Sequence, residues 1–209
     1  MIAIIDYDAG NVKSVEKALQ YLGQEAEITG DKDKILAADR VVLPGVGAFG
    51  LAMDKLRSRG LDKVIYEFVE TGKPFLGICL GLQLLFDSSE ESPGVQGLGL
   101  IKGRITKIPN EYTAEDGSKV FQKVPQIGWN DLKINPKSRL FAGITGNPYV
   151  YFVHSYFLTA DNPEEVAAST YYGTEIHAAV EKGNIFATQF HPEKSSEVGL
   201  KILQNFINL

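Results

Sequence analysis

The chain has 209 residues, a net charge of −5 at pH 7 and one cysteine. This length suits one domain with a sizeable core, and we expect residues 1–209 to form it. One cysteine excludes an intramolecular disulfide, and three scattered histidines argue against a structural zinc site. Acidic and basic residues are interspersed, which argues against a nucleic-acid-binding surface.

The sequence begins MIAIID, which lacks the basic and apolar regions of a signal peptide. No apolar run approaches the ~18 residues that a membrane span needs. With the lone cysteine, these features predict a soluble protein of the reducing cytoplasm.

The first 87 residues alternate short apolar runs with amphipathic segments. Strands are predicted over residues 2–5, 25–29, 40–43 and 75–78. Helices are predicted over residues 12–22, 32–38, 49–59 and 61–70, with a turn over 7–11. Strands and helices in alternation predict βαβ units and a parallel sheet.

The pattern changes after residues 88–99, which are rich in serine, glycine and glutamate. Short alternating strands are predicted over residues 104–108, 119–124, 149–154, 165–171, 176–181 and 185–190. A final helix is predicted to start at Ser195-Ser196-Glu197, where a serine can cap it and the acid suits its N-terminus. We therefore expect an α/β fold with an open, mostly parallel central sheet flanked by helices, and an additional antiparallel or mixed strand region in the second half.

Cys79 stands at the centre of residues 74–86, PFLGICLGLQLLF, between the fourth predicted strand and a helical run over 82–86. Gly77 and Gly81 flank it at the spacing of a nucleophile elbow, a strained turn that exposes its central side chain. The first amides of the helix would favour thiolate over thiol. A single cysteine in an apolar run is more often an inert core residue, so this pattern alone leaves both interpretations open.

Thiolate chemistry needs a base, and the pattern around His177 is that of an ordinary structural strand residue. His191 instead ends a predicted strand and is followed by Pro192 and Glu193. Proline favours extended geometry in the residue before it, so Glu193 can reach one imidazole nitrogen and leave the other for a thiol. This is the nucleophile, base and orienter of a triad. A surface histidine beside an acid is the alternative.

Gly45, Val46 and Gly47 follow the third predicted strand. Loops after parallel strands gather at one edge of a sheet, where ligands bind. Backbone N–H groups here and at Leu80 could form an oxyanion hole, although an ordinary turn is the alternative.

A polar segment, His154, Ser155 and Tyr156, follows the apolar run 149–153. Its backbone and the Gln83 side chain could hold the charged ends of a substrate. The spacing alone does not indicate that role.

Taken together, GICLGLQ, PGVGAF, FVHSYF and QFHPEKS resemble the triad-type (class I) glutamine amidotransferases over almost the whole chain. The opening IIDYDAGNVKSV, the PGVGAFG loop, the stretch IGWN and the ending HPEKSS are similar to the glutaminase subunits of imidazole glycerol phosphate synthase, from histidine biosynthesis. Those subunits commonly have glycine where this chain has Asp8.

The resemblance implies roles for the residues singled out above. Cys79 would attack glutamine, and His191, oriented by Glu193, would move the proton. Gln83 and the segment of His154, Ser155 and Tyr156 would hold the substrate, while the Leu80 amide and the loop of Gly45, Val46 and Gly47 would bind the oxyanion. No cofactor or metal is implied.

The resemblance also implies a partner. Ammonia would pass to a separate cyclase, a (β/α)₈ barrel, for which 209 residues leave no room. The cyclase would make imidazole glycerol phosphate and aminoimidazole carboxamide ribotide. Trp129, Asn130 and Lys194 are expected to contact it.

An isolated glutaminase would waste glutamine, so we expect the partner to switch activity through a peptide flip at Val46 between its two glycines. Turnover of the lone chain as fast as that of the complex would contradict this.

Two other functions fit parts of the pattern. The chain could be another thiol hydrolase, such as a γ-glutamyl hydrolase or a peptidase-like relative. It could also be a silent scaffold that only stabilises a partner. Labelling of Cys79 by a glutamine-analogue electrophile would argue against the first, and unchanged glutaminase activity in Cys79→Ala would support the second.

Overall fold

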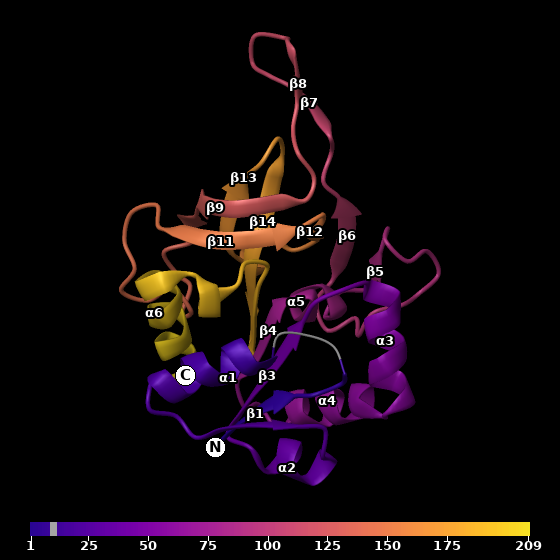
Figure 1. The fold of residues 1–209 in the computed structure, drawn as a ribbon, viewed down its shortest axis with the longest axis vertical. Helices are drawn as coiled ribbons and strands as arrows, with labels where there is room; N and C mark the ends of the chain where they lie inside the picture. Colours follow the sequence, from indigo (N-terminus) through magenta and orange to yellow (C-terminus); the bar gives the residue numbers. More distant parts are fainter. Residues whose placement is uncertain (9–11) are drawn as a thin grey trace.

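The computed structural model describes residues 1–8 and 12–209, and an eight-stranded sheet forms its centre (Figure 1). The parallel part of this sheet consists, in spatial order, of β2 (Ala26–Thr29), β1 (Ile2–Ile5), β3 (Arg40–Gly45), β4 (Phe75–Cys79) and β15 (Ile185–Thr188). Antiparallel strands continue it: β14 (Glu175–Lys182), β13 (Val166–Tyr171) and β10 (Lys133–Ile134). The predicted α/β class and mostly parallel centre are therefore confirmed.

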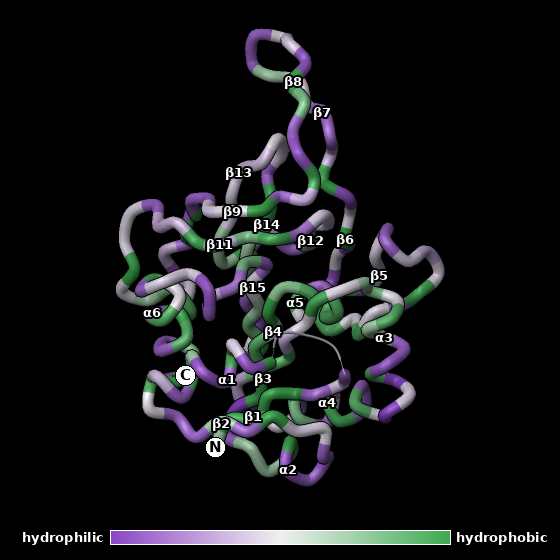
Figure 2. Tube along the Cα trace, in the orientation of Figure 1, coloured by the Kyte–Doolittle hydropathy of each residue, from purple (hydrophilic) through white to green (hydrophobic). Residues whose placement is uncertain are grey.

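Helices cover both faces of the sheet because its central strands are apolar on both sides. In β1, Ile2 and Ile4 face one core cluster, while Ala3 and Ile5 face the other. The first cluster includes α1 (Val12–Tyr21) and α6 (Ser196–Ile207), and the second includes α2 (Lys32–Ala37), α3 (Phe49–Ser58) and α4 (Leu61–Glu70). Figure 2 shows the hydrophobic residues concentrated along β1, β3 and β4. Among the described residues, no helix is both long and apolar enough to cross a membrane.

Smaller sheets account for much of the second half. They are β12 (Tyr156–Ala160) with β6 (Gly103–Lys107) and β5 (Ser88–Ser89), β9 (Gln126–Asp131) with β11 (Tyr149–His154), and β7 (Glu111–Thr113) with β8 (Lys119–Phe121). The β7–β8 hairpin projects away from the rest of the molecule (Figure 1). The antiparallel region was predicted, but β5, β7, β9, β10 and β12 were not.

The turn after β1 was predicted over residues 7–11, of which residues 9–11 lie outside the described residues. Asp8 has a φ of 61°, a left-handed conformation that glycine adopts more readily. Its carboxylate pairs with Arg59 at 3.0 Å. Asp8 therefore takes up a backbone conformation that glycine adopts more readily, at the position where the resemblance leads us to expect glycine.

The turn at Cys79 is strained, as the glycine spacing predicted. Cys79 has φ 56° and ψ −109°, and α5 (Leu80–Leu84) begins at the next residue, two residues earlier than expected. A Cβ atom at position 81 would overlap the carbonyl oxygen of Leu43, and one at Gly77 would lie 2.9 Å from the Gly81 carbonyl oxygen. Both glycines therefore allow α5 to lie directly against β3 and β4.

We predict that Gly81→Ala lowers the free energy of unfolding by about 3 kcal/mol, because a methyl group has no room beside Leu43. Gly94→Ala is the matched control: Gly94 has a φ of 85° but open space around it, so its loss should be about 1 kcal/mol. Urea unfolding of both variants measures the difference. Equal losses would show that contact with β3 does not limit the residue at position 81.

Candidate active site

The candidate site lies at the carboxyl ends of three neighbouring parallel strands. β3 leads into Val46, β4 ends at Cys79, and β15 leads to His191. Gly45 pairs with Cys79, while Ile78 pairs with Thr188 on the other side. The segments therefore meet at the carboxyl edge of the sheet, as expected for ligand sites in open α/β sheets.

A pocket of about 290 Å³ opens where these segments meet, a size suited to a small molecule. All the residues predicted to be catalytic, to bind the oxyanion or to bind substrate line it, except Gly45 and Glu193. The lining consists of Val46, Gly47, Cys79, Leu80, Gln83, Glu91, Pro125, Val153, His154, Ser155, Tyr156 and His191.

His191 and Glu193 form a buried pair behind the pocket. The imidazole Nδ1–H donates to Oε1 of Glu193 at 2.8 Å, and the two side chains are 3% and 1% exposed. Nε2 of His191 makes no hydrogen bond of good geometry within the described chain, and it lies near Cys79. Burial alone would lower the pKa of His191, but interactions with Cys79 and Glu193 outweigh it and raise the pKa to about 9.

The Ser195 side chain holds the His191 backbone in place. The prediction that a serine side chain caps the final helix is therefore wrong for Ser195. Its hydroxyl donates to the His191 carbonyl at 2.7 Å and accepts from the Tyr151 N–H at 3.0 Å. It therefore makes no side-chain capping bond to α6. The His191 N–H in turn donates to the Tyr151 carbonyl at 3.0 Å, so the backbone before Glu193 is fixed against β11.

The loop after β3 is anchored at both ends. The buried Tyr7 hydroxyl donates to the Pro44 carbonyl at 3.0 Å, and the Glu91 carboxylate accepts from the Phe49 N–H at 2.7 Å. Gly47, between these anchors, has a φ of 101°, which favours glycine. Sequence reasoning missed both Tyr7 and Glu91, because their contacts join segments distant in the chain.

Gly45 lies beneath the pocket, where a Cβ atom would come within 2.9 Å of the Leu80 side chain. Leu80 begins α5, so helix geometry does not use its N–H. Leu80, Val46 and Gly47 line the same pocket as Cys79.

The Tyr156 carbonyl bonds to two side chains that line the pocket. It accepts from Nε2 of Gln83 at 3.1 Å and from Nδ1–H of His154 at 2.8 Å. Gln83 Nε2 also donates to Oε1 of Gln189 at 3.0 Å. The amide oxygen of Gln83 therefore remains to accept a hydrogen bond from a ligand. The Ser155 carbonyl accepts from the Ile108 N–H at 2.9 Å.

His154 and His177 are held in structural positions. Nε2 of His154 lies 2.9 Å from the side-chain amide of Gln126, and burial lowers the pKa of His154 to about 4. Nδ1 of His177 accepts from the Ala160 N–H at 3.1 Å, and burial lowers its pKa too. The structural assignment of His177 agrees with these contacts.

An aromatic group lies on the outer face of the β9–β11 sheet. Trp129 is 52% exposed, and its ring centroid lies 6.1 Å from that of Tyr151. Nζ of Lys194 lies 5.9 Å from the same Tyr151 centroid. Asn130 donates to the Tyr171 carbonyl at 3.0 Å. Tyr151, which sequence reasoning missed, thus connects two of the three predicted contact residues.

The comparison with known families agrees with this geometry. The family model described as glutamine amidotransferase class-I matches residues 3–209. The chain belongs to this family. Membership favours a glutamine amidotransferase over the two other functions considered from the sequence.

Relatives of this amidotransferase align over nearly their whole length. The imidazole glycerol phosphate synthase subunit HisH of Methanothermobacter thermautotrophicus is 50% identical, with 100% of this chain and 98% of the relative covered. HisH of Methanocaldococcus jannaschii is 47% identical, with both chains fully covered. HisH of Bacillus cereus (strain G9842) is 49% identical, with 99% of this chain and 93% of the relative covered.

Solved structures share the fold at lower identity. A crystal structure of a glutamine amidotransferase has a TM-score of 0.75 at 20% identity, covering 100% of this chain and 98% of the other. In the structure of PurLQS from Thermotoga maritima, one chain has a TM-score of 0.70 at 22% identity, covering 99% of this chain and 97% of the other. They support the predicted class I amidotransferase fold.

We predict that the free energy of unfolding falls as the pH drops from about 6.5 to 4, in part because of His154. Its folded pKa of about 4 lies below its unfolded value, so the unfolded chain binds more protons in this window. His154→Asn should reduce the loss by about 3 kcal/mol, measured by urea unfolding across the window. The pKa of His177 is lowered too, so this residue adds a pH dependence of the same sign to the unfolding free energy of both wild type and His154→Asn. If the free energy of unfolding depends on pH identically in wild type and His154→Asn, the lowered pKa of His154 is contradicted.

Proposed function

We propose that this chain hydrolyses glutamine at Cys79 and passes the ammonia to a separate cyclase, as part of imidazole glycerol phosphate synthase in histidine biosynthesis. One observation carries the proposal: Cys79 and the His191–Glu193 pair meet at one pocket in a chain 47% to 50% identical, over its whole length, to HisH subunits. We further propose that residues 1–209 form one amidotransferase domain.

The first half of the reaction forms a thioester. The Cys79 thiol gives its proton to Nε2 of His191, and the sulfur attacks the side-chain amide carbon of glutamine. Glu193 stabilises the imidazolium that results, as the raised pKa of His191 indicates. His191 then protonates the leaving nitrogen, the carbon–nitrogen bond breaks, and ammonia departs.

The second half regenerates the thiol. His191 takes a proton from water, whose oxygen attacks the thioester carbon. The carbon–sulfur bond then breaks, glutamate leaves, and the proton returns to Cys79. Both tetrahedral intermediates carry an oxyanion, which the Leu80 amide and the loop of Gly45, Val46 and Gly47 stabilise; one such donor is typically worth ~3 kcal/mol.

The pocket wall supports recognition of the amino-acid end of glutamine. Gln83 offers its carbonyl oxygen, an acceptor that suits the α-ammonium group. The Ser155 and Tyr156 carbonyls already accept internal bonds, so the segment from His154 to Tyr156 meets the substrate with its N–H groups. Such donors suit the α-carboxylate.

The cyclase docks on the outer face of β9 and β11 in this proposal. Ile127 and Trp129 are exposed there beside Tyr149, and Val153 of the same sheet lines the pocket. Exposed apolar residues in a continuous row are typical of protein interfaces. Asn130 and Lys194 supply polar contacts at its edge. The partner is a (β/α)₈ barrel by resemblance, and both subunits work in the cytoplasm.

The central test is co-expression with a candidate cyclase, followed by assays of synthesis with glutamine or with added ammonia. Cys79→Ala should abolish the glutamine-dependent rate, because no thioester can form, while the ammonia-dependent rate stays within about twofold of wild type. Loss of both rates would indicate a failed complex, and retention of both would refute the role of Cys79.

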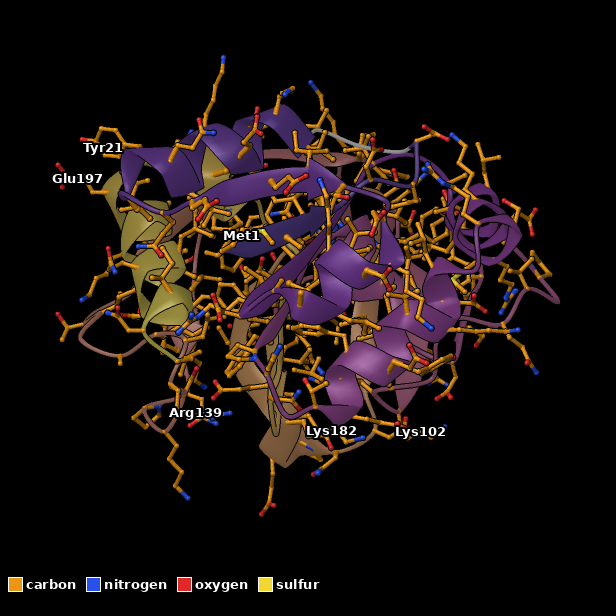
Figure 3. The ribbon with its side chains drawn as sticks, turned by 90° about the horizontal axis from the view of Figure 1, so that it is seen from below. Met1, Tyr21, Lys102, Arg139, Lys182 and Glu197 are labelled. Atoms are coloured by element: carbon orange, nitrogen blue, oxygen red, sulfur yellow. The ribbon has the colours of Figure 1, made fainter. Side chains whose placement is uncertain are left out.

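We predict that Trp129→Ala raises the cyclase concentration needed for half-maximal glutaminase activity by at least about tenfold, because buried tryptophans often dominate interfaces. Titrating the cyclase against each variant measures this. Tyr21→Ala is the matched control: Tyr21 is 79% exposed on α1, at the outer edge of the molecule seen from below (Figure 3). An unchanged half-maximal cyclase concentration in Trp129→Ala would contradict the proposed docking face.

Glutamine turnover by the chain alone that equals turnover by the complex would contradict the proposed switch at Val46.

A further inference from the structure

Gln189 is a fully buried side chain in contact with the nucleophile. It follows β15 directly, at 0% exposure, and its Nε2 donates to Sγ of Cys79 at 3.8 Å. The triad mechanism gives it no role. Its position was readable from the sequence, because residues two apart in an extended segment face the same side and His191 is two residues further on.

The hydrogen-bond network fixes which end of this amide faces the sulfur. The Tyr156 carbonyl can only accept, so the group that Gln83 presents to it must be the NH₂ end. The same NH₂ group donates to Gln189, which therefore presents its oxygen to Gln83. The NH₂ end of Gln189 consequently points to Sγ of Cys79.

This direction matters because the two neighbours of the sulfur favour different protonation states. The Val153 carbonyl, 4.0 Å from Sγ, can accept a hydrogen bond only from the thiol. The Gln189 amide can donate to the thiolate, and bonds to a charged acceptor are stronger than bonds to a neutral one.

We propose that Gln189 is a further catalytic residue, which stabilises the Cys79 thiolate by donating a hydrogen bond to its sulfur. The proposal deepens the glutaminase function and rests on it. It also connects substrate recognition to the nucleophile, because Gln83 holds the Gln189 amide on one side and lines the substrate pocket on the other.

Alkylation of the full chain by iodoacetamide tests this without relying on glutamine binding. Gln189→Met keeps the approximate size of the side chain but has no donor. At about pH 6.5 its alkylation should be about tenfold slower than that of wild type, and the two rates should converge at about pH 10, because strong base favours the thiolate with or without the donor. A rate reduced by the same factor at every pH would indicate a purely structural role and overturn the proposal.

Thr188→Val is the matched control. Thr188 is equally buried, precedes Gln189 and donates its hydroxyl to the Phe190 carbonyl at 3.1 Å. Thr188→Val therefore loses one buried hydrogen bond, whereas Gln189→Met loses those to Cys79 and from Gln83. Its alkylation profile should follow that of wild type. A pH-dependent loss as large as that in Gln189→Met would refute a specific role for the amide.

Gln189→Glu keeps the test decisive if the methionine variant does not fold. It preserves the shape and the acceptor for Gln83, but places a carboxyl group beside the sulfur. Alkylation at about pH 6.5 should again be slower than in wild type, and profiles that superimpose on wild type would overturn the proposal. If the alkylation effect appears but wild type with cyclase hydrolyses no glutamine, the thiolate contact stands and the proposed function fails.

Discussion

The close approach of α5 to β3 is the contact on which the candidate site depends. With glycine at position 81, the first turn of α5 lies directly over the Leu43 carbonyl, and Cys79, just before this turn, has a strained φ of 56° with ψ −109°. A strained residue of this kind costs about 1–3 kcal/mol, which the surrounding structure must offset. The offset comes from apolar strands whose side chains are buried on both faces of the sheet. Folding and reactivity are thus coupled at one turn.

Two histidines in this site behave in opposite ways because of their neighbours. His191 faces a carboxylate and a thiol, so its charged form is favoured despite burial. His154 faces the Tyr156 carbonyl and the Gln126 amide, neither of which carries a charge, so burial dominates and it stays neutral. The same residue type therefore serves as a base in one place and as a support for the backbone in the other.

Sequence periodicity was sufficient for the larger elements. The predicted bounds of β1, α4 and β11 agree with the structure, because β1 and β11 are apolar runs that end at polar residues and α4 has apolar residues at helical spacing after a glycine. The elbow and the His191–Glu193 pair were also predictable, since both depend on local spacing. Short strands such as β5 and β10, of two residues each, give no measurable period.

The remaining features depend on contacts between distant segments. A serine at the start of α6 was predicted to cap the helix. The Ser195 hydroxyl instead bonds to the Tyr151 N–H and the His191 carbonyl, and the local sequence does not reveal these partners. Tyr7 and Glu91 hold the loop after β3 from 37 and 42 residues away along the chain. Gln189 lies in a recognisable motif, but the direction of its amide follows only from the order of donors and acceptors in the folded wall.

The bonds between Tyr151 and His191 have a consequence for the outer surface. The Tyr151 backbone holds the His191 backbone directly and through Ser195, while the Tyr151 ring lies between Trp129 and Lys194 on the outer surface. In the proposed complex, a change at this surface that moves the Tyr151 backbone would therefore also move the imidazole. Partner contacts and proton transfer would then be coupled through one residue of β11.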